Sequence, residues 1–190
     1  MTQTIADTLR WTTADLELLP DDQRRYEIID GELQVTRAPH WQHQSLCGRL
    51  YAALDAWSID SDLGKATINP GIIFTDADNV IPDVVWASHE QLDAALDEAG
   101  HLMAAPELVI EVLSPGDQNQ RRDKDLKLRL YSARGVREYW IVSQSPQQIE
   151  AYRREAGALR LAVTFLAGDE LTTSLLPGFS YPFDRLFHKL

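Results

Sequence analysis

The sequence predicts a mixed α/β domain in which strands outnumber helices, with a hairpin near the N-terminus. Three features carry this prediction: a hairpin signal in residues 25–36, helical spacing of apolar residues in 41–59, and apolar runs typical of buried strands at 82–86 and 108–113. A chain of 190 residues with 44% apolar composition can form one core of ordinary size. We therefore expect a single domain over residues 1–190.

The hairpin is predicted by two short β-prone runs, Arg25–Ile29 and Glu32–Thr36, which the dipeptide Asp30-Gly31 joins. Asp and Gly tolerate the positive φ angles that a two-residue hairpin turn requires, so this pattern is a strong local signal. In the following segment the apolar residues recur at helical spacing, namely Leu46, Leu50, Leu54 and Trp57. This spacing predicts a long helix from Trp41 to Ile59 that lies on a sheet.

The middle of the chain predicts two strands and a short helix. Residues 65–75 and 80–87 are β-prone, and a turn-rich segment at 76–79 separates them. Ser88 to Gln91 has the spacing of a capping box, which predicts that a helix begins there and ends near Gly100.

The second half of the chain predicts a strand, a basic helix and several further strands. After the apolar run at 108–113, the sequence Ser114-Pro115-Gly116 breaks the strand, and a helix is predicted from about Asn119 to Arg134 with a stop at Gly135. The later strands are expected at 137–142, at 148–153, and once or twice in the tail from Ala158 onward.

Two carboxylates interrupt runs that are otherwise apolar. Asp83 begins one of these runs and Glu111 lies inside the other. Removing an ionised carboxylate from water costs several kcal/mol unless a cation, hydrogen bonds or a metal compensates for it. Two such positions on neighbouring strands predict a metal site, and the basic helix that follows supplies a lysine. Two acids and a lysine are suited to hydrolysis of a phosphodiester.

Lys127 is the better candidate of the two lysines in this helix. On a regular helical wheel it lies closer than Lys124 to the expected core face, which consists of Leu126, Leu130 and Ala133. A purely structural alternative is an ion pair between Lys127 and Asp123, four residues before it, which would stabilise the helix by a few tenths of a kcal/mol.

The charge pattern leaves two interpretations open. The net charge of −11 opposes non-specific binding to nucleic acid. The charges are unevenly placed, because residues 121–137 contain seven basic and two acidic residues, whereas residues 76–98 contain seven acidic residues and no lysine or arginine. A basic helix facing an acidic segment fits a metal site that meets phosphate, although a charged run is more often a solvated face.

The single cysteine, Cys47, excludes an internal disulfide and a zinc site built from cysteines of one chain. Residues 1–7 lack the basic start and the apolar stretch of a signal peptide, and no segment has the ~20 apolar residues of a membrane span. The sequence therefore predicts a cytoplasmic protein without a membrane partner.

Two other groups of residues have competing interpretations. His40 and His43 could together ligate zinc, but their place at a helix start favours a helix-end hydrogen bond or a substrate-facing edge. Tyr131, Tyr139 and Trp140 could stack on bases, although their spacing favours core packing.

The pattern around the candidate residues resembles the Uma-two family of restriction-endonuclease-like proteins, within the PD-(D/E)XK nuclease superfamily. The matching features are Pro82-Asp83, Glu111 in Glu-Val-Leu-Ser-Pro, Lys127 ahead of Leu130-Tyr131, Gly135 to Trp140, Tyr26 to Glu32, His43-Gln44 and the Leu-Pro-Gly-Phe of the tail. Each is weak alone, but together they are specific and cover nearly the whole chain.

This resemblance implies a restriction-endonuclease-like fold in which a mixed central sheet is flanked by helices. It also implies that Asp83 and Glu111 hold Mg²⁺, for which Mn²⁺ can substitute, that Lys127 assists catalysis and that Glu27 is a further acid near the metal. One departure from the superfamily pattern is Leu113, which occupies the position of the usual lysine two residues after the second acid. In the Uma-two family the lysine is displaced to the following helix, and Lys127 matches that position.

The sequence thus predicts a magnesium-dependent endonuclease that acts on DNA, and cleavage of both strands of a duplex would suit a homodimer. A non-catalytic nucleic-acid-binding or scaffold protein that keeps the nuclease fold is the alternative. The complete set of Asp83, Glu111 and Lys127 favours the enzyme, whereas the acidic composition favours the alternative. A metal-dependent hydrolase of another phosphoester is a third possibility.

Overall fold

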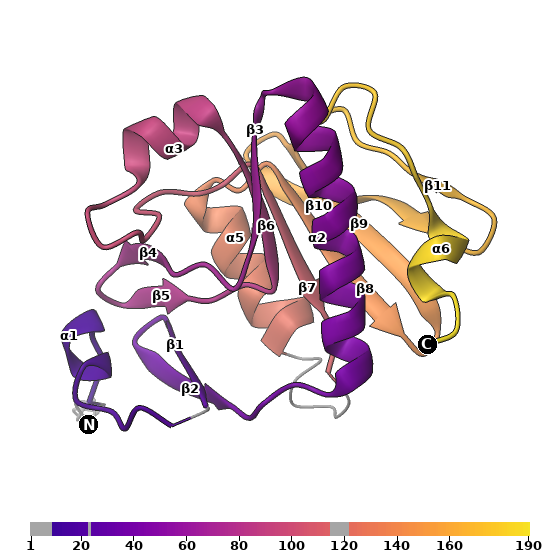
Figure 1. Ribbon diagram of the computed structural model, residues 1–190. Helices are drawn as coiled ribbons and strands as arrows, with labels where there is room; N and C mark the ends of the chain where they lie inside the picture. The colour runs from indigo at the N-terminus through magenta and orange to yellow at the C-terminus, as the bar shows by residue number, and fades with distance from the viewer. Residues whose placement is uncertain (1–8, 23, 115–121) are drawn as a thin grey trace, which may run out of the picture.

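The central layer of the molecule is a six-stranded mixed sheet, as predicted (Figure 1). The computed structural model describes residues 9–22, 24–114 and 122–190. The strand order is β10-β9-β8-β7-β6-β3, and β7 and β8 run parallel while their neighbours pair antiparallel. The strands are β3 Gly64–Ile68, β6 Val84–Ser88, β7 Leu108–Val112, β8 Glu138–Gln144, β9 Gln147–Glu155 and β10 Ala158–Phe165.

Helices cover both faces of this sheet. The long helix α2, Trp41–Ser61, crosses one face, while the π-helical segment η1, Arg122–Lys127, and α5, Leu128–Arg134, connect β7 to β8 on the other (Figure 1). The remaining helices are short: α1 Thr13–Leu16, α3 His89–Ala95 and α6 Phe183–Phe187. None of the described helices is both long and apolar enough to cross a membrane.

Two hydrophobic cores form because side chains alternate between the faces of each strand. On β7, Ile110 belongs to the core under α2, whereas Val109 belongs to the core under α5. Every residue of β7 is buried, which confirms the buried strand predicted from its apolar run. Glu111 has the same parity as Val109, so its carboxylate lies on the α5 side of the sheet.

The predicted N-terminal hairpin is present and belongs to a second sheet. β1, Arg25–Ile29, pairs antiparallel with β2, Glu32–Thr36. Asp30 and Gly31 have φ angles of 50° and 73°, the positive values that the Asp-Gly turn predicts. The order of this sheet is β2-β1-β5-β4, with β4 Ile72–Thr75 and β5 Asp78–Val80.

Several predicted boundaries were wrong because turn residues interrupt the β-prone runs. The strand expected at 65–75 is divided at Asn69, whose φ of 52° ends β3, so that β3 and β4 lie in different sheets. The strand expected at 80–87 is divided into β5 and β6, and α3 ends at Ala95 rather than near Gly100. The tail contributes three strands, β10, β11 (Glu170–Leu171) and β12 (Tyr181–Pro182), instead of one or two beyond β9.

The regular helical wheel used for the basic helix was also wrong in part. Leu126 and Ala133, expected in the core, are exposed, although Leu130 is buried. The cause is the π-helical segment η1, whose longer hydrogen-bond spacing shifts the phase of the residues along the helix. The predicted stop at Gly135 is confirmed by its φ of 98°. The predicted strand break at Pro115-Gly116 and the helix start near Asn119 lie outside the described residues.

Close packing of β3 against β6 requires glycine at position 64. A Cβ atom added there would lie 2.3 Å from the carbonyl oxygen of Ala87 and 2.6 Å from the ring of Trp86. We expect Gly64→Ala to lower the free energy of unfolding by about 1–3 kcal/mol, as overpacked cores do. Gly48→Ala is the control, because a Cβ at this exposed position in α2 meets nothing within 4 Å. Equal urea midpoints for Gly64→Ala and the unmodified chain would contradict this prediction.

Candidate active site

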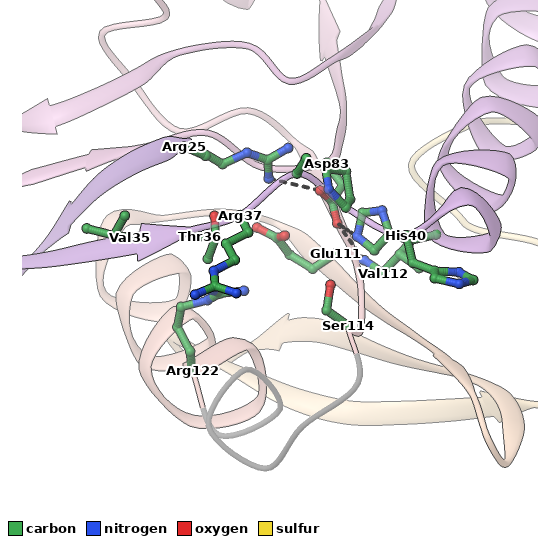
Figure 2. Close-up of a pocket in the computed structure, with 13 residues that line it drawn as sticks. Arg25, Val35, Thr36, Arg37, His40, Asp83, Glu111, Val112, Ser114 and Arg122 are labelled. Carbon is green, nitrogen blue, oxygen red and sulfur yellow. Dashed lines mark hydrogen bonds and ion pairs between the residues drawn. The ribbon is translucent and has the colours of Figure 1, made fainter. Parts of the chain in front are cut away.

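The two predicted metal-binding acids lie opposite each other at the same end of β6 and β7. Val84 pairs with Ile110 in the antiparallel register, so Asp83 and Glu111 occupy the next opposed position. Both residues line a pocket of about 330 Å³ (Figure 2). The register of two adjacent strands therefore brings together two carboxylates that are separated by 27 residues along the chain.

Asp83 is held by three different elements of the fold. One carboxylate oxygen, Oδ1, accepts a hydrogen bond from Nη1 of Arg25 on β1, at 3.0 Å. The other, Oδ2, lies 2.9 Å from the backbone N–H of Val112 on β7 and 3.1 Å from Nε2 of His43 on α2. Burial alone would raise the pKa of Asp83, but the hydrogen bond and charge of His43 and the charge of Arg25 outweigh burial and lower it well below its usual range. Asp83 therefore remains an anion.

Glu111 has a different electrostatic environment. Its Oε1 atom accepts from Nζ of Lys127 at 2.8 Å and from the hydroxyl of Tyr131 at 3.0 Å. Burial raises the pKa of Glu111 above its usual value, the charge of Lys127 opposes this shift, and the nearby charge of Asp83 reinforces it. The two carboxylates of the pocket thus differ in how readily they release a proton.

Glu27 reaches the same cluster from the hairpin. Its Oε1 atom lies 2.9 Å from Nζ of Lys127 and accepts a hydrogen bond from the backbone N–H of Ile81 at 2.9 Å. Glu27 is almost completely buried, because the face of β1 that carries it turns toward the interior. The hairpin therefore contributes an acid to the interior of the cluster.

Lys127 is fully buried between the carboxylates of Glu27 and Glu111. Burial lowers the pKa of an ammonium group, but here the charges of the two glutamates outweigh burial and raise it above its usual value. The alternative ion pair with Asp123 is not formed within the described residues, since Asp123 pairs with Arg122 at 2.9 Å. Lys124 lies on the surface instead, 3.5 Å from Glu150.

The structure brings together all four of the predicted site residues, Glu27, Asp83, Glu111 and Lys127. Among the described residues, only Asp83 and Glu111 of these four line the pocket. Lys127 and Glu27 lie behind Glu111. Lys127 contacts Glu111 directly, and Glu27 is linked to it through the ammonium group of Lys127.

Sequence reasoning missed Arg25, and it named His43 as a candidate zinc ligand or substrate-facing residue without its contact to Asp83. Arg25 precedes Glu27 by two residues on a β-prone run, so the two side chains lie on the same face of the strand. His43 precedes Leu46 by three residues in the helical pattern, which places it on the buried face of α2. Both signals were present in the sequence, but neither indicates which residue the side chain contacts.

The other candidate residues have structural roles. His40 is the N-cap of α2, and its Nδ1 atom accepts a hydrogen bond from the N–H of Gln42 at 3.3 Å, which confirms the predicted helix-end bond. Tyr131, Tyr139 and Trp140 are buried, which confirms core packing.

A second set of metal-binding residue types adjoins Asp83. Ligand atoms of His43, Cys47 and Asp83 all lie within 4.8 Å of one another. Nδ1 of His43 lies 3.5 Å from the sulfur of Cys47, and burial raises the pKa of this thiol above its usual value. The thiol is therefore a neutral neighbour of the histidine.

Comparison with family models gives a match over most of the chain. The sequence model of the Uma2 family, described as "Putative restriction endonuclease", matches residues 13–184. The chain belongs to the Uma2 family. It is the same family that the sequence motifs resemble. None of the curated proteins matches this Uma2 chain.

A solved structure shares the fold of this Uma2 protein. The crystal structure described as "a putative nuclease belonging to DUF820" from Anabaena variabilis superposes with a TM-score of 0.74. The superposition covers 93% of this chain and 97% of the other, at 16% sequence identity. The restriction-endonuclease-like fold class predicted from the sequence is thereby confirmed.

The buried position of Lys127 gives a testable difference between the two lysines of the basic helix. Lys127→Ala would leave two buried carboxylates without their shared cation, and we expect it to lower the free energy of unfolding by about 3–5 kcal/mol. Lys124→Ala removes only a surface ion pair and should change it by about 0–1 kcal/mol. Urea denaturation followed by circular dichroism measures both values. A loss of stability in Lys127→Ala as small as that in Lys124→Ala would show that the buried ion pairs contribute little.

Proposed function

We propose that the protein is a divalent-metal-dependent endonuclease that hydrolyses phosphodiester bonds of DNA. The observation that carries the proposal is the opposed pair Asp83 and Glu111, two buried carboxylates that face one pocket from adjacent strands. Membership of the Uma2 family, whose description names a restriction endonuclease, supports a nuclease function of this kind.

The donor atoms of the pocket fit Mg²⁺, and Mn²⁺ as its substitute. Mg²⁺ prefers oxygen ligands and is commonly bound by one or two carboxylates together with water and substrate phosphate. Oε1 of Glu111 takes both described donors, Lys127 and Tyr131, so within the described residues Oε2 has no donor and is available as a ligand. When bound, the ion would polarise the phosphodiester and make a water molecule more acidic.

The surrounding side chains keep the two proposed ligands in place. Arg25 and His43 hold Asp83 at its two oxygens, while Lys127 and Tyr131 hold Glu111. Lys127 does not line the pocket among the described residues, so its proposed role is to position Glu111 and to balance its charge rather than to touch the substrate. Glu27 in turn fixes Lys127.

The homodimer, the cytoplasmic location and the single-domain organisation stay predictions. A homodimer would place two sites on opposite strands of a duplex. Light scattering of the purified chain, with and without DNA, measures this assembly directly.

Cleavage assays with matched variants test the proposed chemistry. Supercoiled plasmid, linear duplex and single strands are incubated with Mg²⁺ or Mn²⁺ and the unmodified chain, Glu111→Gln or Glu155→Gln. We expect Glu111→Gln to reduce cleavage by about a hundredfold or more, because it removes a ligand of the ion that stabilises developing charge. Glu155 is exposed at the end of β9, so its substitution should leave the rate unchanged. Equal cleavage by all three proteins would refute the assigned site.

Calorimetric titration with Mg²⁺ tests the metal site independently of activity. The unmodified chain should bind the ion in the millimolar range or tighter, and Asp83→Asn should bind it at least about tenfold more weakly because a charged ligand becomes neutral. Thermal denaturation of the variant checks that it is folded. Absence of binding by the unmodified chain, with and without DNA, would contradict catalysis and favour a non-catalytic nucleic-acid-binding protein.

A further inference from the structure

The segment that links the hairpin to α2 forms one wall of the pocket. β2 ends at Thr36 and α2 begins at Trp41, and residues 37–40 between them all line the pocket. This segment, called here the entry segment (residues 37–41), begins with a cation and ends with an aromatic residue. Neither of these two side chains takes part in the buried network around Asp83 and Glu111.

Arg37 is a cation facing the proposed metal ligands. In Figure 2 the side chains of Arg37 and Arg122 lie on one side of Glu111, and Arg25 and Asp83 lie on the other. The guanidinium of Arg122 is engaged by Asp123 at 2.9 and 3.2 Å, whereas Arg37 is exposed and forms no ion pair with another described residue. A planar guanidinium of this kind is suited to bidentate binding of a phosphate group.

Trp41 is an exposed aromatic residue at the other end of the entry segment. Its exposed fraction is 84%, while Trp86 and Trp140 are buried in the core. It directly follows His40, which lines the pocket, so residue 41 adjoins the same site along the chain. An exposed indole offers a flat apolar face on which a ligand can stack.

The occupant that fits both side chains is a nucleic-acid strand. A cation that binds the backbone and an aromatic ring on which a base stacks are the two elements of single-strand recognition. The positive charge of Arg37 complements a polyanion. In an intact duplex each base is already stacked on both faces, so an accessible base face requires an unpaired nucleotide.

We propose that Arg37 binds a backbone phosphate and Trp41 stacks on an unpaired base of the strand that enters the pocket. The preferred substrate is therefore a single-stranded segment, such as a single strand, a flap or a frayed end. This inference rests on the proposed nuclease function and names the substrate class of the same site.

Binding measurements separate this role from catalysis. Fluorescein-labelled single-stranded and blunt duplex DNA of the same sequence are titrated with the unmodified chain, with Ca²⁺ in place of Mg²⁺ to limit cleavage. We expect Trp41→Ala to weaken single-strand binding by about tenfold, from the loss of one stacking contact, while Trp41→Phe keeps most of the affinity. Duplex DNA should bind more weakly than single-stranded DNA to each protein, and its affinity should not change in Trp41→Ala.

Arg37→Ala should weaken binding of the single strand by about tenfold and reduce the slope of log K against log salt by about 0.7, the loss of one phosphate contact. Arg160→Ala and Leu161→Ala, at exposed positions on the edge strand β10, are the controls and should change neither value. Binding should also quench tryptophan fluorescence in the unmodified chain, and this quenching should be much reduced in Trp41→Phe.

The outcomes distinguish this inference from the proposed function. If the unmodified chain cleaves DNA, and Trp41→Ala and Arg37→Ala bind single strands as tightly as it does, the entry-segment proposal is overturned and the nuclease function stands. Tighter binding of duplex than of single strand would overturn the substrate preference and leave the metal site standing. Neither binding nor cleavage by the unmodified chain would overturn the proposed function itself, and a protein partner would then be the better explanation for the exposed Trp41.

Discussion

The buried ammonium group of Lys127 connects the parts of the structure that form the site. It lies 2.8 Å from Glu111 on β7 and 2.9 Å from Glu27 on β1, so one cation joins the central sheet, the second sheet and the segment η1. Each of these charges would be costly alone in the interior. Their mutual compensation permits Glu111 to line the pocket and Glu27 to lie buried behind it.

Asp83 is the second residue at which separate elements of the fold meet, and it lies on the opposite side of the pocket. The hairpin contributes Arg25, the helix α2 contributes His43, and β7 contributes the N–H of Val112. Asp83 and Glu111 therefore differ: the first is stabilised as an anion by donors on both oxygens, whereas burial disfavours the charge of the second.

The N-terminal hairpin contributes to the site as much as the central sheet does. It supplies Arg25 and Glu27 from β1, and the segment after β2 supplies Arg37. This arrangement also relates the acidic composition to a nucleic-acid substrate. The chain carries a net charge of −11, yet arginines gather around one pocket, so any affinity for phosphate would be local rather than spread over the surface.

The sequence alone predicted the element types and the hairpin with its Asp-Gly turn, because periodicity and turn residues are local. It also marked Asp83 and Glu111 as lone charges in apolar runs, whereas the family and Glu27 came from the resemblance of motifs along the chain. Lys127 was selected by a regular wheel that placed Leu126 wrongly, since a π-helical turn is not visible in the periodicity. Only the tertiary structure decided that Arg25 and His43 hold Asp83, that β3 and β4 belong to different sheets, and that Lys127 lies behind Glu111 rather than in the pocket. These contacts join residues far apart along the chain, and strand register and helix placement fix them rather than any local pattern.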